Sequence, residues 1–441
     1  MGRRPKQEKK APKLQKEKIK TFQLLRGMKD ILPSEQKYWH QIRILGEKIA
    51  YDYGFKRIDS PILEELGLFI RSIGKETDIV QKELFSFIDQ GGDKIGLRPE
   101  FTAGLARAYI EHGMFNLPQP VKLYTNGPVF RHERPQSGRA RQFHQLNFEV
   151  LGDDQPVIDA QLILLAYSFF KELGLETKVE INSIGCPECR ENYRETLVSY
   201  LRSKRSQLCE TCKKRISHNP LRVFDCKEQK CQSVKEEAPQ IIDWLCDDCK
   251  NHFMRVLEYL DELEVLYEPN PYLVRGLDYY TRTVFEVFTK NSINKSAQES
   301  IAAGGRYDNL IEFLGGRPTP ASGMAIGIER SILKMKEAKV EPAEVPAPQI
   351  FLAQLGEKAK IKALSLFEAL RREGIPVTEN LSKSSLRAQL DIANKLGVKL
   401  TLILGQKEVS DGMILIRDME SGIQEEVDYN KVIKEIKKKI L

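Results

Sequence analysis

Two neighbouring segments define the centre of the fold: Phe130-Arg131-His132-Glu133-Arg134 and Gln142-Phe143-His144-Gln145-Leu146-Asn147-Phe148-Glu149. Apolar residues recur at strand spacing here, which predicts two strands, Lys122–Val129 and Phe143–Leu151. The residues that join them, Arg131–Arg141, are rich in arginine and glycine. We therefore expect two neighbouring strands with a basic loop between them.

Polar side chains gather on one face of each of these segments. Arg131 and Glu133 alternate, so they share a face of an extended chain, where a cation and an acceptor can hold a phosphate and an amino-bearing base together. The alternative is a solvated, salt-bridged hairpin loop. Gln145, Asn147 and Glu149 alternate on the next strand between apolar residues, and buried polar groups of this kind require partners or a ligand.

The rest of the first 340 residues shows mixed helix and strand patterns. Tyr38, Ile42, Leu45 and Ile49 form one helical face, and Gly54 ends that helix. Further expected elements are a helix near Ile158–Leu173, strands at Lys178–Asn182, Tyr272–Val274 and Thr283–Thr289, a glycine-rich segment at Ala302–Gly305, and a helix that starts near Gly323.

The C-terminal part follows a different pattern. Lys336–Pro348 contains three prolines and little apolar periodicity, which indicates a linker. Beyond it strands and helices alternate, which predicts a small α/β domain with a largely parallel core. The expected elements are Gln349–Gln354 (strand), Lys358–Arg372 (helix), Ile375–Thr378 (strand), Ser385–Leu396 (helix), Lys399–Leu404, Met413–Arg417 and Gln424–Val427 (strands), and a basic terminal helix.

The positive charge is concentrated at the N-terminus. The formal net charge is +7, and Met1–Lys20 hold nine Lys or Arg against two Glu, so the rest is formally neutral. We interpret residues 1–20 as a disordered basic tail, which could also attract phosphates nonspecifically. No apolar run reaches the roughly 18 residues of a membrane span, and no secretory signal is recognisable, so we expect a cytoplasmic protein.

All eight cysteines fall within one segment, Cys186–Cys249. Three C-x-x-C pairs and a looser pair have zinc-ligand spacing, and eight thiolates could form two tetrahedral sites that stabilise a small insertion, residues 186–262. The ligand candidates are Cys186, Cys189, Cys209, Cys212, Cys226, Cys231, Cys246 and Cys249. The alternative is a set of reduced thiols in an insertion that folds without metal. A redox role is disfavoured, because no thioredoxin-like βαβ pattern surrounds the pairs.

The chain has no G-x-x-x-x-G-K-[ST] loop and no strand-linked G-x-G-x-x-G motif, so side chains would have to hold any phosphate. Arginine suits this task, because its planar guanidinium stays charged and donates bidentate hydrogen bonds.

At this point the motifs resemble a known family. Phe130–Glu133 with its basic loop is similar to motif 2 of the class II aminoacyl-tRNA synthetases, Gly323–Arg330 to motif 3, and Gly54 through Glu64 to the weaker motif 1. Leu273–Tyr280 and Ala303–Asp308 resemble two signatures peculiar to histidine–tRNA ligases. The resemblance extends from Arg26 to the C-terminus. It implies activation of L-histidine with ATP to histidyl-adenylate and pyrophosphate, then transfer to the 3′ end of tRNA(His).

The resemblance also implies an architecture. It predicts an α+β catalytic domain over 21–340, built on an antiparallel sheet with helices and carrying the Cys-rich insertion. An α/β domain over 349–441 resembles the anticodon-binding domain of several class II enzymes. Relatives are homodimers through the motif 1 region, although the apolar face of the first helix could equally be core.

The family match assigns roles to individual residues. Arg131 and Arg275 would be catalytic, with both reaching the α-phosphate as the histidine carboxylate attacks. Fixed cations of this kind are the main requirement for catalysis of adenylate formation. Negative charge builds on the phosphorus oxygens during this step, and no protein nucleophile is needed. ATP would enter with Mg²⁺ and meet Arg131, Glu133, Arg139 and Arg330, with Glu133 on the adenine amino group and Arg330 at the γ-phosphate.

Histidine would be recognised at both ring nitrogens. The family match has Glu149 accept from one and the Tyr280 hydroxyl contact the other, with Tyr279 nearby. Another amino acid in this pocket would leave these polar groups unpaired. This should favour histidine over that amino acid by roughly 10⁴-fold or more. The full histidine set is Glu100, Thr102, Arg131, Gln145, Glu149, Arg275, Tyr279 and Tyr280.

Each element alone has a purely structural interpretation. Tyr279 and Tyr280 could be packing aromatics, Ala303–Gly305 a tight turn, and Arg330 a helix-surface charge. Their joint occurrence in order favours the enzyme. Two other functions are possible for such a fold: a synthetase-like regulatory subunit of ATP phosphoribosyltransferase, which typically lacks the C-terminal domain and the Arg275 signature, and a nucleic-acid-binding module without activity.

Overall fold

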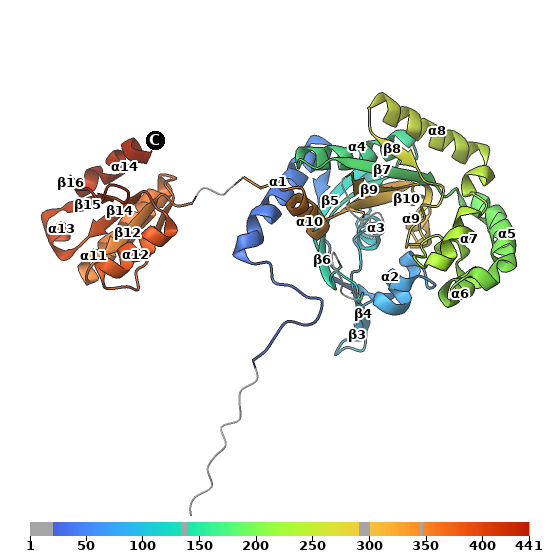
Figure 1. Ribbon diagram of the computed structural model, residues 1–441, viewed down its shortest axis with the longest axis horizontal. Helices are drawn as coiled ribbons and strands as arrows, with labels where there is room; N and C mark the ends of the chain where they lie inside the picture. The colour runs from blue at the N-terminus through green and yellow to red at the C-terminus, as the bar shows by residue number, and fades with distance from the viewer. Residues whose placement is uncertain (1–20, 134–138, 291–299, 344–346, 441) are drawn as a thin grey trace, which may run out of the picture. The chain divides into compact units, whose positions relative to one another are not determined.

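The computed structural model describes residues 21–133, 139–290, 300–343 and 347–440 (Figure 1). The chain forms two compact units, Met1–Pro342 and Ala343–Leu441, which are described separately below. The basic tail predicted at 1–20 lies outside the described residues. So do Arg134, Gln136 and Gly138 of the basic loop.

The first unit is built on an eight-stranded sheet with the order β1-β5-β6-β11-β10-β9-β7-β8. Neighbours from β5 to β7 are antiparallel, and only the two edge pairs, β1–β5 and β7–β8, are parallel. The strands are β1 (Lys56–Arg57), β5 (Val121–Phe130), β6 (Gln142–Leu151), β7 (Thr177–Ser183), β8 (Tyr267–Pro269), β9 (Thr281–Thr289), β10 (Ala302–Arg306) and β11 (Ala321–Gly327).

The two strands predicted from the central segments are confirmed as β5 and β6. Their antiparallel register places Asn147 opposite Thr125, and on the other side β6 pairs with β11, so Glu149 lies opposite Gly323. Residues far apart in sequence therefore meet at the middle of the sheet.

Helices cover the sheet and close its main core. The face of α1 that includes Tyr38, Ile42 and Ile49 is buried against α4 and the sheet, so it belongs to the core. The helices outside the cysteine-rich segment are α1 (Gln36–Asp52), α2 (Leu66–Ile73), α3 (Thr102–Glu111), α4 (Pro156–Glu172), α9 (Leu310–Phe313) and α10 (Ile328–Glu337). A small sheet, β2-β4-β3, consists of β2 (Leu63–Glu65), β3 (Ser86–Ile88) and β4 (Lys94–Leu97).

The cysteine-rich segment lies between β7 and β8 and is helical. Its helices α5 and α6 contact each other at one end of the unit (Figure 1). The second half of α8 packs through Phe253, Val256 and Leu260 into the main core. The α-helices are α5 (Pro187–Ser203), α6 (Glu210–His218), α7 (Gln232–Glu236) and α8 (Asp247–Glu262), with short 3₁₀ turns such as η5 (Pro220–Val223) between them.

The second unit is a five-stranded sheet with the order β13-β12-β14-β15-β16. The predicted α/β unit is confirmed, but its core is only half parallel, because β13, β12 and β14 are parallel whereas β15 and β16 are added antiparallel. Its elements are β12 (Ile350–Gln354), α11 (Glu357–Arg372), β13 (Val377–Glu379), α12 (Leu386–Leu396), β14 (Leu400–Leu404), α13 (Gln406–Asp411), β15 (Met413–Asp418), β16 (Gln424–Asp428) and α14 (Val432–Ile440).

Three local predictions were wrong. Tyr272–Val274 forms no strand but a turn and an extended segment after β8. Gly323 does not start a helix: it lies inside β11, and α10 begins only at Ile328. The short helix α13 was missed. Among the described helices, none has the length and apolar character needed to cross a membrane.

Candidate active site

A polar cavity of about 490 Å³ opens beside β6, β10 and β11 of the first unit. Most of the residues predicted for ATP and histidine line it, although they come from five separate parts of the chain. They are Glu100, Thr102, Arg131, Glu133, Arg139, Gln145, Arg275, Tyr279, Tyr280 and Arg330. Glu149 is not part of the lining and lies directly behind Thr102.

Arg131 and Glu133 reach the cavity from the end of β5. The Nε of Arg131 donates to the carbonyl of Pro99 at 2.9 Å, and its guanidinium lies 5.4 Å from the centre of the Phe143 ring. Glu133 forms a 3.0 Å ion pair with Arg139. Both residues of this ion pair also line the cavity. The loop is therefore salt-bridged, as the alternative interpretation had it, and it also faces the proposed ligand site.

Arg275 is held by a carboxylate on a neighbouring strand. It pairs through Nη1 with Glu286 of β9, and its guanidinium lies 5.4 Å from the ring of Tyr280. Burial lowers the pKa of Arg275, but the charge of Glu286 outweighs this and raises it above its ordinary value. Arg275 thus remains a fixed cation. On the opposite wall, Arg330 Nη1 donates to the Ser300 carbonyl at 2.9 Å.

Glu149 is a buried carboxyl, 1% exposed, at the centre of the sheet. It accepts hydrogen bonds from the hydroxyls of Thr102 and Tyr307. Burial raises the pKa of Glu149 to about 8, although these two hydroxyls act in the opposite direction. Gly323 makes room for the carboxyl, since a Cβ there would lie 1.5 Å from Glu149 Oε2.

Glu100 holds the first turn of α3. Its two oxygens accept from the backbone N–H groups of Thr102 at 2.6 Å and Ala103 at 2.8 Å. Burial raises the pKa of Glu100, while these N–H groups lower it. Glu100 therefore has a structural role at the helix start as well as a position on the cavity wall.

Three buried polar atoms on this wall have no hydrogen-bond partner among the residues that the structure describes: Gln145 Oε1, Asn147 Oδ1 and Arg275 Nε. Buried polar groups are nearly always paired in folded proteins. Their convergence on one cavity indicates a polar ligand.

Sequence reasoning missed several residues of the site. Tyr307 was quoted within a signature, but its contact with Glu149 depends on the pairing of β10 with distant strands. Glu286 faces the cavity because β9 alternates inward and outward, which only the register reveals. The cysteine-rich segment adds a further part of the lining: Arg215, Arg222, Asp225 and Lys227.

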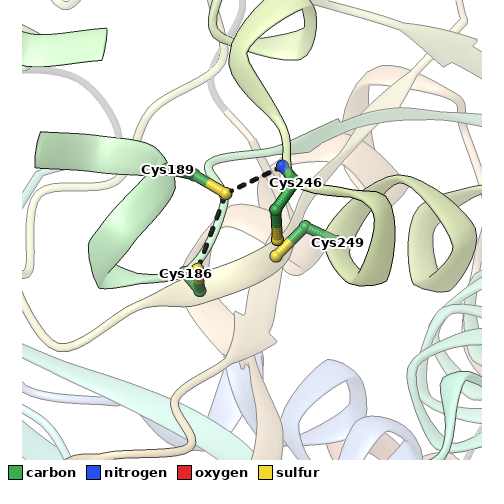
Figure 2. Close-up of side chains that lie close together, drawn as sticks. All are labelled: Cys186, Cys189, Cys246 and Cys249. Carbon is green, nitrogen blue, oxygen red and sulfur yellow. Dashed lines mark hydrogen bonds between the residues drawn. The ribbon is translucent and has the colours of Figure 1, made fainter. Parts of the chain in front are cut away.

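The eight cysteines form two separate groups of four. In each group the sulfur atoms lie within 4.8 Å of one another. One group is Cys186, Cys189, Cys246 and Cys249, in which the backbone N–H of Cys246 donates to Cys189 Sγ at 3.1 Å (Figure 2). The other group, all buried, is Cys209, Cys212, Cys226 and Cys231. Either group could hold a metal ion, since four thiolates are a typical zinc ligand set.

An antiparallel sheet beside one polar cavity, lined by arginines from a strand end, a loop and a helix, is the architecture of the class II aminoacyl-tRNA synthetases. The family model for histidyl-tRNA synthetase matches residues 27–330, and that for the anticodon binding domain matches residues 349–439. The chain belongs to the histidyl-tRNA synthetase family.

Curated relatives agree over nearly the whole length. The histidine–tRNA ligase of Dehalococcoides mccartyi is 46% identical over 420 residues, which is 95% of this chain and all of that protein. The enzyme of Acetivibrio thermocellus is 45% identical over 93% of this chain and 98% of its own length. The crystal structure of apo histidyl-tRNA synthetase from S. aureus superposes with a TM-score of 0.78 at 32% identity, covering 94% of this chain and 99% of that one.

The predicted class II fold and the predicted activity are thereby confirmed. The chain is an ATP-dependent ligase that joins histidine to tRNA.

Proposed function

We propose that both steps of the reaction take place in the 490 Å³ cavity, with ATP and histidine side by side. The observation that carries this is the convergence of Gln145 Oε1, Asn147 Oδ1 and Arg275 Nε, buried and without protein partners in the described chain. A polar substrate would pair them. The arginines on the surrounding walls would balance the negative charge of ATP.

ATP would bind as its Mg²⁺ complex between the end of β5 and the start of α10. Arg131 would hold the α-phosphate, and its bond to Pro99 fixes the guanidinium for that purpose. Glu133 would accept from the adenine amino group, with Arg139 beside it. Arg330 would hold the γ-phosphate, and its bond to Ser300 sets its direction.

Activation would be an in-line displacement at the α-phosphorus. The histidine carboxylate attacks, the bond to the pyrophosphate oxygen breaks, and pyrophosphate leaves. Arg275 and Arg131 would stabilise the negative charge that builds on the phosphorus oxygens. Because Glu286 orients Arg275 before substrate enters, little reorganisation is needed at the moment of reaction.

Histidine would be recognised by groups on α3, β6 and the segment before β9. Glu149 would accept from one imidazole nitrogen through a remaining lone pair, and Tyr280 would contact the other, with Tyr279 packed 4.8 Å from the Tyr280 ring. The α-ammonium would be held by the polar atoms of Glu100, Thr102 and Gln145.

The experiment is ATP–pyrophosphate exchange measured with each amino acid in turn. We expect exchange with histidine alone. Arg275→His should slow it by about 10²- to 10³-fold, the loss typical when a single charge-stabilising donor is removed. The matched control is Arg255→His, an exposed helix residue outside the cavity, which should exchange at the wild-type rate. Near-normal exchange by Arg275→His would contradict its catalytic role.

A regulatory subunit without ligase activity is disfavoured for specific reasons. Arg275 lies in the cavity with its carboxylate partner, and a complete second unit follows the linker. We propose domain limits of 21–340, including the insertion 186–262, for catalysis and 349–441 for anticodon binding.

Each four-cysteine group would hold one structural zinc ion. The thiol positions suit tetrahedral ligation, and backbone N–H groups already donate to the sulfurs, as Cys209 N–H does to Cys231 Sγ at 3.3 Å. Protein purified without chelator should contain about two zinc ions per chain, as elemental analysis would measure. Fewer than one would contradict both sites. All eight cysteines are free of disulfide bonds, which is consistent with a protein that acts in the reducing cytoplasm.

A homodimer through the motif 1 region is also proposed. The buried face of α1 is core, but its outer side and β2 expose apolar side chains, among them Ile44 at 52% and Leu63 at 48%. Light scattering should give twice the chain mass of 50.6 kDa. A monomer at all concentrations would contradict the dimer.

A further inference from the structure

The second cysteine group is joined to the active-site cavity by a short piece of chain. Residues 213–225, here called the wall segment, run from Cys212 to Cys226, so both ends adjoin ligands of the same group. Arg215, Arg222 and Asp225 of this segment line the cavity that contains Arg275. The cysteine-rich insertion is therefore part of the active-site wall.

The wall segment contacts the chain on both sides of Arg275. Before it, the Phe224 ring lies 5.7 Å from the ring of Tyr272. After it, Asn219 Nδ2 donates to Asp278 Oδ1 at 3.0 Å. Arg222 packs on Gly276, where an added Cβ would lie 3.0 Å from its Nη1.

These contacts matter because secondary structure does not fix this part of the chain. Residues 270–280 form neither helix nor strand. The backbone position of Arg275 therefore depends on what packs against it. On the side of the insertion, the wall segment lies beside Arg275 itself, while Glu236 and Arg190 bond to Tyr272 and Tyr280 at the two ends of the segment.

Ion pairs attach the wall segment to the rest of the unit around Asp78. Arg215 and Arg222 both approach Asp78, at 2.9 and 3.5 Å, and Arg222 also pairs with Asp225 at 2.6 Å. The regular structure of the segment is limited to the end of α6 and the turn η5. Its two ends converge on the four buried sulfurs, so an ion there would fix both ends at once.

We propose that the metal ion held by Cys209, Cys212, Cys226 and Cys231 positions Arg275 for histidine activation through the wall segment. This rests on the zinc binding and on the role of Arg275 proposed above. Asn219 and Arg222 are then positioning residues, which act through the Arg275 segment.

The other cysteine group provides a comparison within the same chain. Neither its cysteines nor the residues inside its two C-x-x-C pairs line the cavity in the described structure. It reaches the neighbourhood through Arg190, whose Nη1 donates to the Tyr280 carbonyl at 3.1 Å. Loss of this ion is therefore expected to act first on Tyr280, which is proposed to bind histidine, and to leave the backbone of Arg275 in place.

The first test uses the full chain with Cys226→Ser and, as the matched variant, Cys246→Ser. Each should lose about one of two zinc ions. Cys226→Ser should lower kcat of histidine-dependent exchange by about 10²-fold, the effect of displacing a catalytic group by about 1 Å, with a smaller change in KM. Cys246→Ser should change kcat less than about 3-fold. Equal losses in both variants, or normal kcat in zinc-depleted Cys226→Ser, would overturn the proposal.

The second test leaves the ligands intact, so it holds even if Cys226→Ser fails to fold. Asn219→Ala should keep its zinc and lower kcat by about 3- to 10-fold, the range expected for a typical single hydrogen bond in a protein. Lys214→Ala, an exposed change in α6, which ends one residue before Asn219, should have no effect. Normal kcat in Asn219→Ala would overturn the proposal.

A double-mutant comparison separates positioning from general destabilisation. If Asn219 acts through Arg275, adding Asn219→Ala to Arg275→Ala should reduce the remaining exchange by less than about 2-fold. Fully multiplicative losses would overturn the proposal. Absence of exchange in the wild-type protein would refute the proposed function itself, a different outcome from any of these.

Discussion

Glu149→Gln tests the environment of the buried carboxyl that is proposed to read the imidazole. The glutamine has the same shape and can still pair with the hydroxyls of Thr102 and Tyr307, but it has no charge. Burial raises the pKa of Glu149 to about 8, against an ordinary 4.5. The folded protein therefore binds this proton more tightly than the unfolded chain does.

The sign and size of the stability effect follow from this difference. The contribution of Glu149 to the free energy of unfolding is largest below about pH 4.5 and is lost progressively as the pH rises to about 8. Since each pKa unit corresponds to about 1.4 kcal/mol, the full loss is about 4 to 5 kcal/mol as an upper limit. Because glutamine does not titrate, position 149 makes no such pH-dependent contribution to the free energy of unfolding in the variant.

The measurement is urea unfolding of wild type and Glu149→Gln at several pH values from about 5 to about 9. The stability of the variant relative to wild type should rise by several kcal/mol between about pH 5 and about pH 8, then level off. In the same preparations KM for histidine should rise at least about 10-fold, because one of the two acceptor oxygens is replaced by an NH₂ donor. A difference in stability that does not change with pH would refute the reasoning.

Three further changes test the same centre. Gly323→Ala places a Cβ 1.5 Å from Glu149 Oε2, so it should destabilise the protein by about 1–3 kcal/mol and raise KM for histidine, as denaturation and exchange kinetics would measure. Asp159→Asn should destabilise by about 3–5 kcal/mol in urea unfolding, because it removes a carboxylate from fully buried Arg306 at 2.9 Å. Although burial raises the pKa of Asp159, the charge of Arg306 lowers it below its usual range, so this loss should shrink as the pH falls below about 4, opposite to Glu149. Tyr307→Phe removes one donor to Glu149 and should raise KM for histidine about 3- to 10-fold with kcat little changed; an unchanged KM would count against the contact.

The spacing of apolar residues was sufficient to predict those helices and strands that follow a single helical or strand period throughout. The β5–β6 pair, α4 and most of the second unit were predicted, because each has a clear apolar repeat and a turn at its end. The prediction of a helix start near Gly323 was wrong, because the neighbouring carboxyl of Glu149 requires a glycine there, inside β11. Tyr272–Val274 has strand-like composition, but its apolar side chains pack on the insertion and form no ladder.

The site was predictable where its residues lie in recognisable motifs. Arg131, Arg275 and Arg330 could be named, since family signatures contain them, and all three line one cavity. Glu286 and Tyr307 could not be derived from local sequence, because only strand register brings them to Arg275 and Glu149. The contribution of residues 213–225 to the wall had no sequence signal at all, since spacing alone cannot say where an insertion folds back.

The order of strands has a consequence for synthesis of the chain. β6 gains its second neighbour only when β11 has been made, more than 150 residues later. Until then the backbone groups on this edge of β6 have no neighbouring strand to pair with. The strand includes the apolar residues Leu146, Phe148 and Val150, and unpaired strand edges of this kind favour aggregation. A ribosome-bound chain that ends before Ala321 therefore lacks the β11 wall of the cavity, and this edge of β6 stays open to other chains until β11 has been made.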